Sequence, residues 1–253
     1  MVRPMRLGSG PMIFALVGQK GGSGKTTTAL SVAAELLARG SSVLVVDADP
    51  QLSARTWGEV ATEAGHAVPT IVALGANMFQ ADQVPRLAQS YDHVVIDCPP
   101  SNGVIQRAAL MSCDVALLPC GQSGLDAWAL ASTMTLVGEA SALRPGLQVV
   151  ALLTRVQGRT VLGQGARVAL EQAGLSVLTS KLGYRVAFQE AITAGLGAST
   201  YAPGDAAAGE VRALVDELLA LAPRPAGKAA RAPRPPKPAA PSSKGSKGAS
   251  RGR

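Results

Sequence analysis

The sequence predicts an α/β fold in which a doubly wound, mostly parallel sheet carries helices on both faces. Short apolar runs of buried-strand type alternate with stretches of helical periodicity along the chain. Apolar residues make up 47% of the composition and aromatic residues only 3%, so Ala, Leu and Val must fill the core. At 253 residues the chain has room for one such domain rather than two.

A glycine-rich turn joins the first expected strand to the first expected helix. The strand is the apolar run Met12–Gly18, and the helix is Thr26–Arg39, where apolar residues recur at helical spacing until Gly40. Between them lies GQKGGSGKTTT, Gly18–Thr28. In such a turn successive backbone N–H groups point at phosphate oxygens, and the helix N-terminus adds positive potential. The turn therefore predicts nucleotide binding.

The residue types of this loop suit phosphates and a metal ion. We expect Lys25 to reach the β- and γ-phosphates and the Thr26 hydroxyl to hold Mg²⁺. Gln19 stands where the common phosphate-loop pattern has its first glycine. A glycine-rich turn without a ligand is the alternative, and the agreement of strand, loop and helix argues against it. The expected ATP-binding residues in the loop are Gly21, Gly22, Ser23, Gly24, Lys25, Thr26 and Thr27.

Acidic residues follow two of the later expected strands. DADPQ, Asp47–Gln51, comes after one apolar run, and Asp97 ends another. The carboxyl ends of parallel strands are where α/β sheets place ligands. Asp-Pro pairs also commonly begin turns, so a strand-end turn is the alternative for Asp47 and Asp49. The later expected strands are Val43–Val46, Val94–Ile96, Val115–Leu118, Val149–Leu153 and Leu175–Leu178.

Three motifs, KGGSGKT, DADPQ and VVIDCPPS at Val94–Ser101, occur in an order that resembles the deviant Walker A group of P-loop NTPases, the ParA/MinD family. The resemblance covers about Met12–Leu221. Gln19 before the extra lysine, the DPQ string and the C-terminal layout resemble short ParA-type partition ATPases without an N-terminal DNA-reading domain. The family resemblance implies ATP and Mg²⁺ as cofactors and a homodimer in the ATP-bound form.

The resemblance also implies roles for single residues. Lys20 would cross the dimer interface to the phosphates held by the partner subunit, and Asp49 would position or activate the attacking water, so Lys20, Lys25 and Asp49 form the expected catalytic set. Thr26, Asp47 and Asp97 form the expected metal set. Two lysines, a metal ion and a carboxylate near the water supply most of what phosphoryl transfer requires. No arginine inside the motifs is placed as a stimulating finger, so we expect weak basal hydrolysis.

Two features after the acidic motifs bear on ligand recognition. Thr154 and Arg155 end an apolar strand where many family members place an Asn that reads adenine; Arg155 is therefore an expected ATP-binding residue, while Thr154 lacks the amide. Pro99–Ser101 would begin the switch that senses the γ-phosphate. Cys98, Cys113 and Cys120 show no C-x-x-C spacing, and we expect buried core thiols rather than an iron–sulfur site.

The chain divides by composition into three parts. We expect residues 1–11 to be a disordered leader, 12–222 the ATPase domain, and 223–253 a disordered tail built from Pro, Ala, Gly, Ser and basic residues. The tail holds nine Lys or Arg and no acid, and subtracting these from the net charge of +7 leaves −2 for the rest. A flexible polycation attracts polyanions by counterion release, and nonspecific DNA is the natural candidate.

Basic residues in the domain and tail are the candidate DNA contacts, and solvated surface charge with a solubilising tail is the alternative. A membrane-binding last helix at Glu210–Leu221 is disfavoured because its polar face is acidic, which anionic lipid would repel. The candidate DNA contacts are Arg155, Arg159, Arg167, Lys181, Arg185, Lys237, Lys244 and Lys247.

Together these features predict a cytoplasmic, nucleoid-associated protein, because no stretch is long enough to span a bilayer and the start has no signal-peptide core. We expect a ParA-type ATPase that dimerises on ATP, binds DNA nonspecifically and is released when a ParB-like or adaptor protein stimulates hydrolysis. The alternative is a MinD-like membrane-associated regulator of division or polarity. The motifs do not distinguish plasmid, chromosome, chemoreceptor cluster and carboxysome as cargo.

Overall fold

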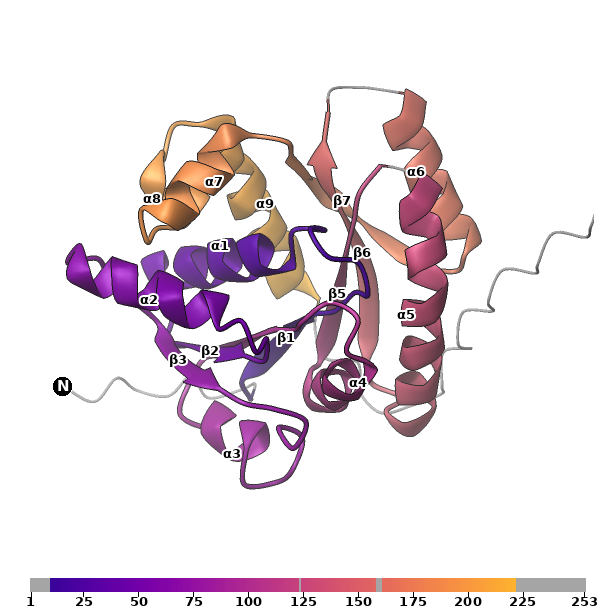
Figure 1. Cartoon of the computed structure of the whole chain (residues 1–253), viewed down its shortest axis with the longest axis horizontal. Helices are drawn as coiled ribbons and strands as arrows, with labels where there is room; N and C mark the ends of the chain where they lie inside the picture. Colours follow the sequence, from indigo (N-terminus) through magenta and orange to yellow (C-terminus); the bar gives the residue numbers. More distant parts are fainter. Residues whose placement is uncertain (1–9, 123, 158–160, 222–253) are drawn as a thin grey trace, which may run out of the picture.

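The computed structural model describes residues 10–122, 124–157 and 161–221, which form one seven-stranded sheet with helices on both faces (Figure 1). The strand order is β3-β2-β4-β1-β5-β6-β7, and each pairing is parallel. The doubly wound α/β fold predicted by the sequence is confirmed. The strands are β1 (Met12–Leu16), β2 (Val43–Asp47), β3 (Thr70–Ala73), β4 (His93–Asp97), β5 (Val115–Cys120), β6 (Gln148–Val156) and β7 (Ser176–Gly183). The helices are α1 (Lys25–Ala38), α2 (Ser53–Glu63), α3 (Val84–Ala88), α4 (Gly103–Ser112), α5 (Gly124–Leu143), α6 (Val161–Gln172), α7 (Val186–Thr193), α8 (Ala198–Tyr201) and α9 (Ala206–Ala220).

The sheet separates two apolar clusters, as alternation along a strand requires. In β1, Ile13 and Ala15 belong to the cluster beneath α3, α4, α5 and α6, while Phe14 and Leu16 belong to the cluster beneath α1, α2, α7, α8 and α9. Each of these four side chains is buried. Ala, Leu and Val dominate both clusters, in accord with the low aromatic content of the sequence.

Of the seven strands, β3 is the one that the sequence does not predict. It has four residues, TIVA, at the edge of the sheet, and both of its end residues are exposed. A short, half-exposed edge strand lacks the continuous apolar run by which the buried strands are recognised.

The last helix, α9, is docked on the domain by both its apolar and its acidic residues. Its stripe of Val211, Leu214 and Val215 is fully buried against the cluster that contains α1. The Glu217 carboxylate accepts hydrogen bonds from the Thr179 and Ser180 N–H groups of the edge strand β7, at 2.7 and 2.8 Å. The Glu217 side chain therefore pairs with backbone N–H groups at the edge of the sheet. The helix begins four residues before the expected Glu210.

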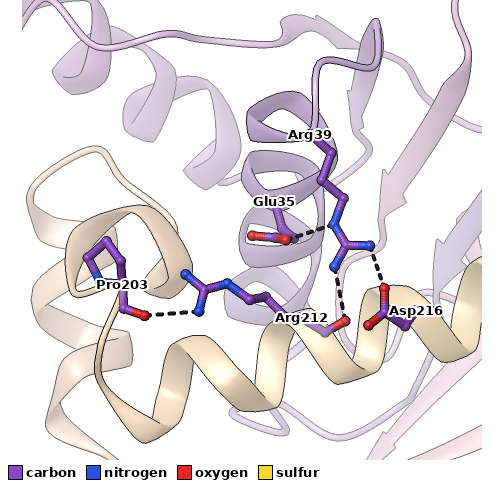
Figure 2. Close-up of polar contacts among 5 residues, drawn as sticks. All are labelled: Glu35, Arg39, Pro203, Arg212 and Asp216. Carbon is purple, nitrogen blue, oxygen red and sulfur yellow. Dashed lines mark hydrogen bonds and ion pairs between the residues drawn. The ribbon is translucent and has the colours of Figure 1, made fainter.

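A cationic side chain joins α9 to the first helix (Figure 2). Arg39, at the end of α1, pairs through Nε with Glu35 at 2.7 Å and through Nη1 with Asp216 of α9 at 2.5 Å. Its Nη2 also donates to the Arg212 carbonyl oxygen at 3.2 Å. One guanidinium thus ties the helix that follows the glycine-rich loop to the helix that precedes the C-terminal tail.

A glycine turn between α7 and α8 packs directly on two helices. Gly195 has φ +69°, and a Cβ there would lie 2.6 Å from backbone atoms of Ala61 in α2. A Cβ on Gly197 would lie 2.6 Å from the Ala34 side chain of α1. Only glycine permits this approach.

In the described part of the chain, no helix combines the length and apolar character needed to cross a membrane.

Candidate nucleotide-binding site

The expected site residues meet at the carboxyl ends of three adjacent strands, β2, β4 and β1. Asp97, the last residue of β4, pairs in register with Leu16 at the end of β1 on one side and with Asp47 at the end of β2 on the other. The glycine-rich loop leaves β1 at this edge and enters α1 at Lys25. The three motifs, separated along the sequence, therefore converge.

The first half of the loop is held by side chains that follow β4. Gln106 of α4 is fully buried, and its Nε2 donates to the Gly18 carbonyl oxygen at 3.2 Å and to the Pro99 carbonyl oxygen at 2.9 Å. The Ser101 hydroxyl and N–H donate to the Gln19 carbonyl oxygen at 2.8 and 3.1 Å. The segment expected to act as a switch is thus hydrogen-bonded to the loop.

The second half of the loop is held from the end of β6. The Thr154 hydroxyl donates to the Ser23 carbonyl oxygen at 2.9 Å, and Arg155 Nη1 donates to the Gly22 carbonyl oxygen at 2.9 Å. Thr154 is 2% exposed, whereas Arg155 is exposed and its guanidinium lies 5.3 Å from the ring centroid of Tyr184. In this structure both expected base-reading positions contact the loop.

The loop presents backbone donors because its carbonyls are turned toward these side chains. Among hydrogen bonds between described residues, none uses the N–H groups of residues 21–24. Gly22 and Gly24 adopt left-handed conformations, φ +70° and +92°, which glycine reaches without strain. Unpaired N–H groups ahead of a helix N-terminus form a cradle for an anion.

Lys25 lies inside this cradle, 5% exposed, with its Nζ donating to the Lys20 carbonyl oxygen at 2.9 Å. Burial lowers the pKa of the Lys25 amine, and the Asp97 carboxylate opposes that change. The ammonium has a backbone oxygen as its partner here, and a phosphate oxygen is a stronger acceptor that could replace it.

Asp97 is the acid most suited to a metal ion. It is fully buried, and neither carboxylate oxygen has a hydrogen-bond partner. Burial raises the pKa of Asp97 to about 7, and Asp47 adds to the rise. The Thr26 hydroxyl lies close enough to oppose the rise, although it forms no hydrogen bond with the carboxylate. Two unpartnered buried oxygens beside a hydroxyl fit Mg²⁺, which prefers oxygen ligands.

Asp47 and Asp49 also serve the turn that leads into α2. Asp47 Oδ1 accepts from the Asp49 N–H at 3.2 Å, and Oδ2 accepts from the Arg55 N–H at 3.0 Å. Asp49 Oδ1 accepts from the Gln51 N–H at 3.0 Å. The turn interpretation is thus realised in the structure, while the metal and water roles of these two acids stay predictions.

The candidate DNA contacts have mixed positions. Arg167 bonds to Glu171 and to the Val177 and Leu178 carbonyl oxygens, and Arg185 pairs with Glu210 at 2.8 Å. Lys181 is exposed on β7. DNA binding by this set stays a prediction. Arg159, Lys237, Lys244 and Lys247 lie outside the described residues.

Sequence reasoning missed two residues that hold the loop. Gln106 sits in an otherwise apolar helical pattern, and Thr133 of α5 accepts a hydrogen bond from the Gln19 N–H at 3.3 Å. A buried polar side chain on a core-facing helix is the only local signal for either residue.

Comparison with known proteins places this geometry among nucleotide-binding domains. The CobQ/CobB/MinD/ParA nucleotide-binding domain matches residues 14–197. A carboxysome distribution protein A of Halothiobacillus neapolitanus is 32% identical over 210 residues, 81% of this chain and 95% of that protein. The chromosome-partitioning ATPase Soj of Thermus thermophilus is 30% identical over 236 residues, 82% and 95% of the two chains.

Solved structures share the fold. Apo McdA of Cyanothece superposes with a TM-score of 0.67 at 20% identity, covering 82% of this chain and 99% of that one. MinD of Pyrococcus horikoshii, complexed with Mg-ADP, superposes with a TM-score of 0.60 at 22% identity, covering 83% and 98%.

Proposed function

The chain belongs to the CobQ/CobB/MinD/ParA nucleotide-binding domain family, and from that premise we propose that it is a ParA-type ATPase that positions a cargo. ATP and Mg²⁺ bind at the loop, the ATP-bound chains dimerise and bind DNA nonspecifically, and a ParB-like or adaptor partner releases them by stimulating hydrolysis. Names of relatives include both carboxysome distribution and chromosome partitioning, so the cargo is a large assembly of one of these kinds.

The observation that carries the proposal is the second lysine in the phosphate loop. Lys20 lies five residues before Lys25, in a loop that leaves β1 beside the end of β4, where Asp97 lies. Lys25 is the residue that would meet the phosphates within the same chain. Lys20, near the start of the loop, would then contact the phosphates held by a second chain, and dimerisation would depend on the nucleotide.

The chain's own residues account for the chemistry of hydrolysis. Thr26 and Asp97 would hold Mg²⁺, which supplies charge neutralisation at the phosphates when bound. Lys25 would leave the Lys20 carbonyl and contact phosphate oxygens. Asp49 would orient the attacking water. Slow basal turnover follows from the absence of an arginine finger in the motifs.

DNA rather than a membrane is favoured as the surface. The amphipathic last helix is docked, with Leu214 fully buried and Glu217 bonded to β7, so undocking it would expose core residues. The charge excess lies in the tail, which has no large apolar side chain to insert into lipid. A polycation without apolar anchors binds polyanions in a salt-sensitive way.

The test is dimerisation and DNA co-sedimentation with and without ATP and Mg²⁺. Lys25→Ala should abolish ATP-dependent dimerisation and DNA co-sedimentation by removing nucleotide binding. Lys20→Ala should keep nucleotide binding but lose dimerisation and DNA co-sedimentation. Asp49→Ala should trap the DNA-bound dimer. Arg86→Gln, a charge change on the exposed face of α3, is the matched control.

A Lys20→Ala protein that still dimerises and binds DNA with ATP would refute the role of the second lysine. Co-sedimentation with anionic phospholipid vesicles in preference to DNA, unchanged when residues 223–253 are removed, would instead support the membrane function.

A further inference from the structure

We propose that Arg155 is a positioning residue that fixes the phosphate loop through the Gly22 carbonyl and does not contact the nucleotide base. This inference rests on the proposed nucleotide binding and names how the site is held ready for it. The two donors from the end of β6, the Thr154 hydroxyl and the Arg155 guanidinium, are called the β6 brace.

The β6 brace acts on the peptide groups that must present donors to phosphate. Thr154 binds the Ser23 carbonyl oxygen and Arg155 the Gly22 carbonyl oxygen, each at 2.9 Å. A peptide group whose oxygen is held on one side must direct the N–H of the following residue to the other side. Holding these two oxygens therefore directs the N–H groups of Ser23 and Gly24 into the cradle.

The backbone at Arg155 indicates that this contact is built into the fold. Arg155 has φ +55°, a left-handed conformation that is strained for a residue with a side chain. The β6–β7 register is irregular at the same place, between Leu153 and Val156. A strained arginine that reaches a loop 133 residues away is consistent with a positional task.

A second strand fixes the guanidinium itself. The guanidinium of Arg155 lies 5.3 Å from the centroid of the Tyr184 ring, which follows β7, the neighbour of β6 in the sheet (Figure 1). A cation over an aromatic face is attracted by the ring quadrupole and loses rotational freedom. With one nitrogen on Gly22 and its plane near Tyr184, the guanidinium is oriented by the protein rather than left for a base.

The experiment compares binding of ATP with binding of sodium tripolyphosphate, both with Mg²⁺, by calorimetry on the full chain. Tripolyphosphate has no base, so a positioning residue affects both ligands equally. Arg155→Gln should weaken both by about tenfold, the size expected for one charge-assisted hydrogen bond. Tyr184→Leu should weaken both by a smaller common factor, and Tyr184→Phe, which keeps the ring, should bind as the wild type.

Two further variants separate geometry from charge. Arg155→Lys keeps the charge but not the planar fork, and it should recover only part of the affinity. Arg86→Gln removes one exposed positive charge on α3, which carries none of the site residues, and should change neither dissociation constant. Thermal melting without ligand confirms that each variant is folded.

Three results would overturn the inference. Arg155→Gln could bind both ligands as the wild type does. It could lose affinity for ATP alone, which would mean that Arg155 contacts the nucleotide base. Arg155→Lys could restore full affinity while Tyr184→Leu has no effect, which would make Arg155 a simple charge. A wild-type chain that binds neither ligand would instead refute the proposed function.

Discussion

Asp47 and Asp97 are register partners at the ends of the adjacent parallel strands β2 and β4. Both are buried, at 1% and 0% exposure, yet only Asp47 accepts hydrogen bonds, from the backbone of its own turn. Burial raises the pKa of both carboxyls, and that of Asp97 reaches about 7. Two neighbouring acids with different environments suit different tasks, one structural and one open to a ligand.

Asp97→Asn should stabilise the ligand-free chain at pH 8. The pKa of Asp97 is raised to about 7, so between about pH 4 and 7 the folded state holds a proton that the unfolded state has lost. Wild-type stability should therefore fall as pH rises through this window, by on the order of 2–4 kcal/mol. The variant should lack this fall. Urea unfolding in EDTA at pH 5 and pH 8 measures the difference.

The controls for this prediction are Mg²⁺ and the neighbouring acid. Mg²⁺ with ATP should stabilise the wild type at pH 8 and not Asp97→Asn. Asp47→Ala should destabilise the chain at both pH values because it removes the acceptor for the Asp49 and Arg55 N–H groups. A wild type and an Asp97→Asn variant with parallel pH profiles would show that Asp97 titrates normally.

The sequence predicts the elements of this site better than the contacts that hold them. Asp97 follows an apolar strand and the glycine loop follows another, so their meeting at one sheet edge is a consequence of parallel topology. The bond from Arg155 to Gly22 and that from Gln106 to Gly18 span 133 and 88 residues and leave no local pattern. Such contacts depend on tertiary packing, which a single sequence does not reveal.

The acids of the last helix show the same limit. Their spacing indicates a polar face, and that alone argues against a membrane. The structure gives them partners: Glu217 binds the edge of β7, and Asp216 binds Arg39 (Figure 2). The acids on the polar face of α9 therefore link this helix to α1 and to β7 while staying at the protein surface.

Arg39→Met should lower the free energy of unfolding by about 1–2 kcal/mol. The side chain is 29% exposed and bonds to Glu35, to Asp216 and to a carbonyl oxygen of α9, so its loss removes the link between α1 and α9. Arg55→Met is the control, because the Arg55–Glu59 pair is 63% and 57% exposed and should contribute about 0.3–0.5 kcal/mol. Urea denaturation at neutral pH compares the two, and equal losses would contradict a special role for Arg39.

Gly195→Ala should lower the free energy of unfolding by about 3 kcal/mol, more than the same substitution at a glycine with open space around it. Its φ is +69°, and the added Cβ would lie 2.6 Å from backbone atoms of Ala61. Gly65→Ala is the matched control: its φ is +73°, and nothing lies within 4 Å of the added Cβ. It should cost about 1 kcal/mol, from backbone strain alone. Similar denaturation midpoints for the two variants would show that the turn shifts to accommodate the added Cβ at little cost in stability.

Glu217→Gln should destabilise the chain by about 1 kcal/mol at pH 7 and by nothing near pH 3. Partial burial works to raise the pKa of Glu217, but the Thr179 and Ser180 donors outweigh it and hold the pKa below its usual value. A depressed pKa means that the contribution of Glu217 to stability is complete above the unfolded-state pKa and is lost as pH falls through the folded-state pKa.

Urea denaturation midpoints from pH 3 to pH 7 test this prediction, with Glu63→Gln, on the exposed face of α2, as control. The difference between wild type and Glu217→Gln should grow with pH, because only the ionised carboxylate accepts both N–H groups of β7; a constant difference would mean that an amide docks the helix equally well.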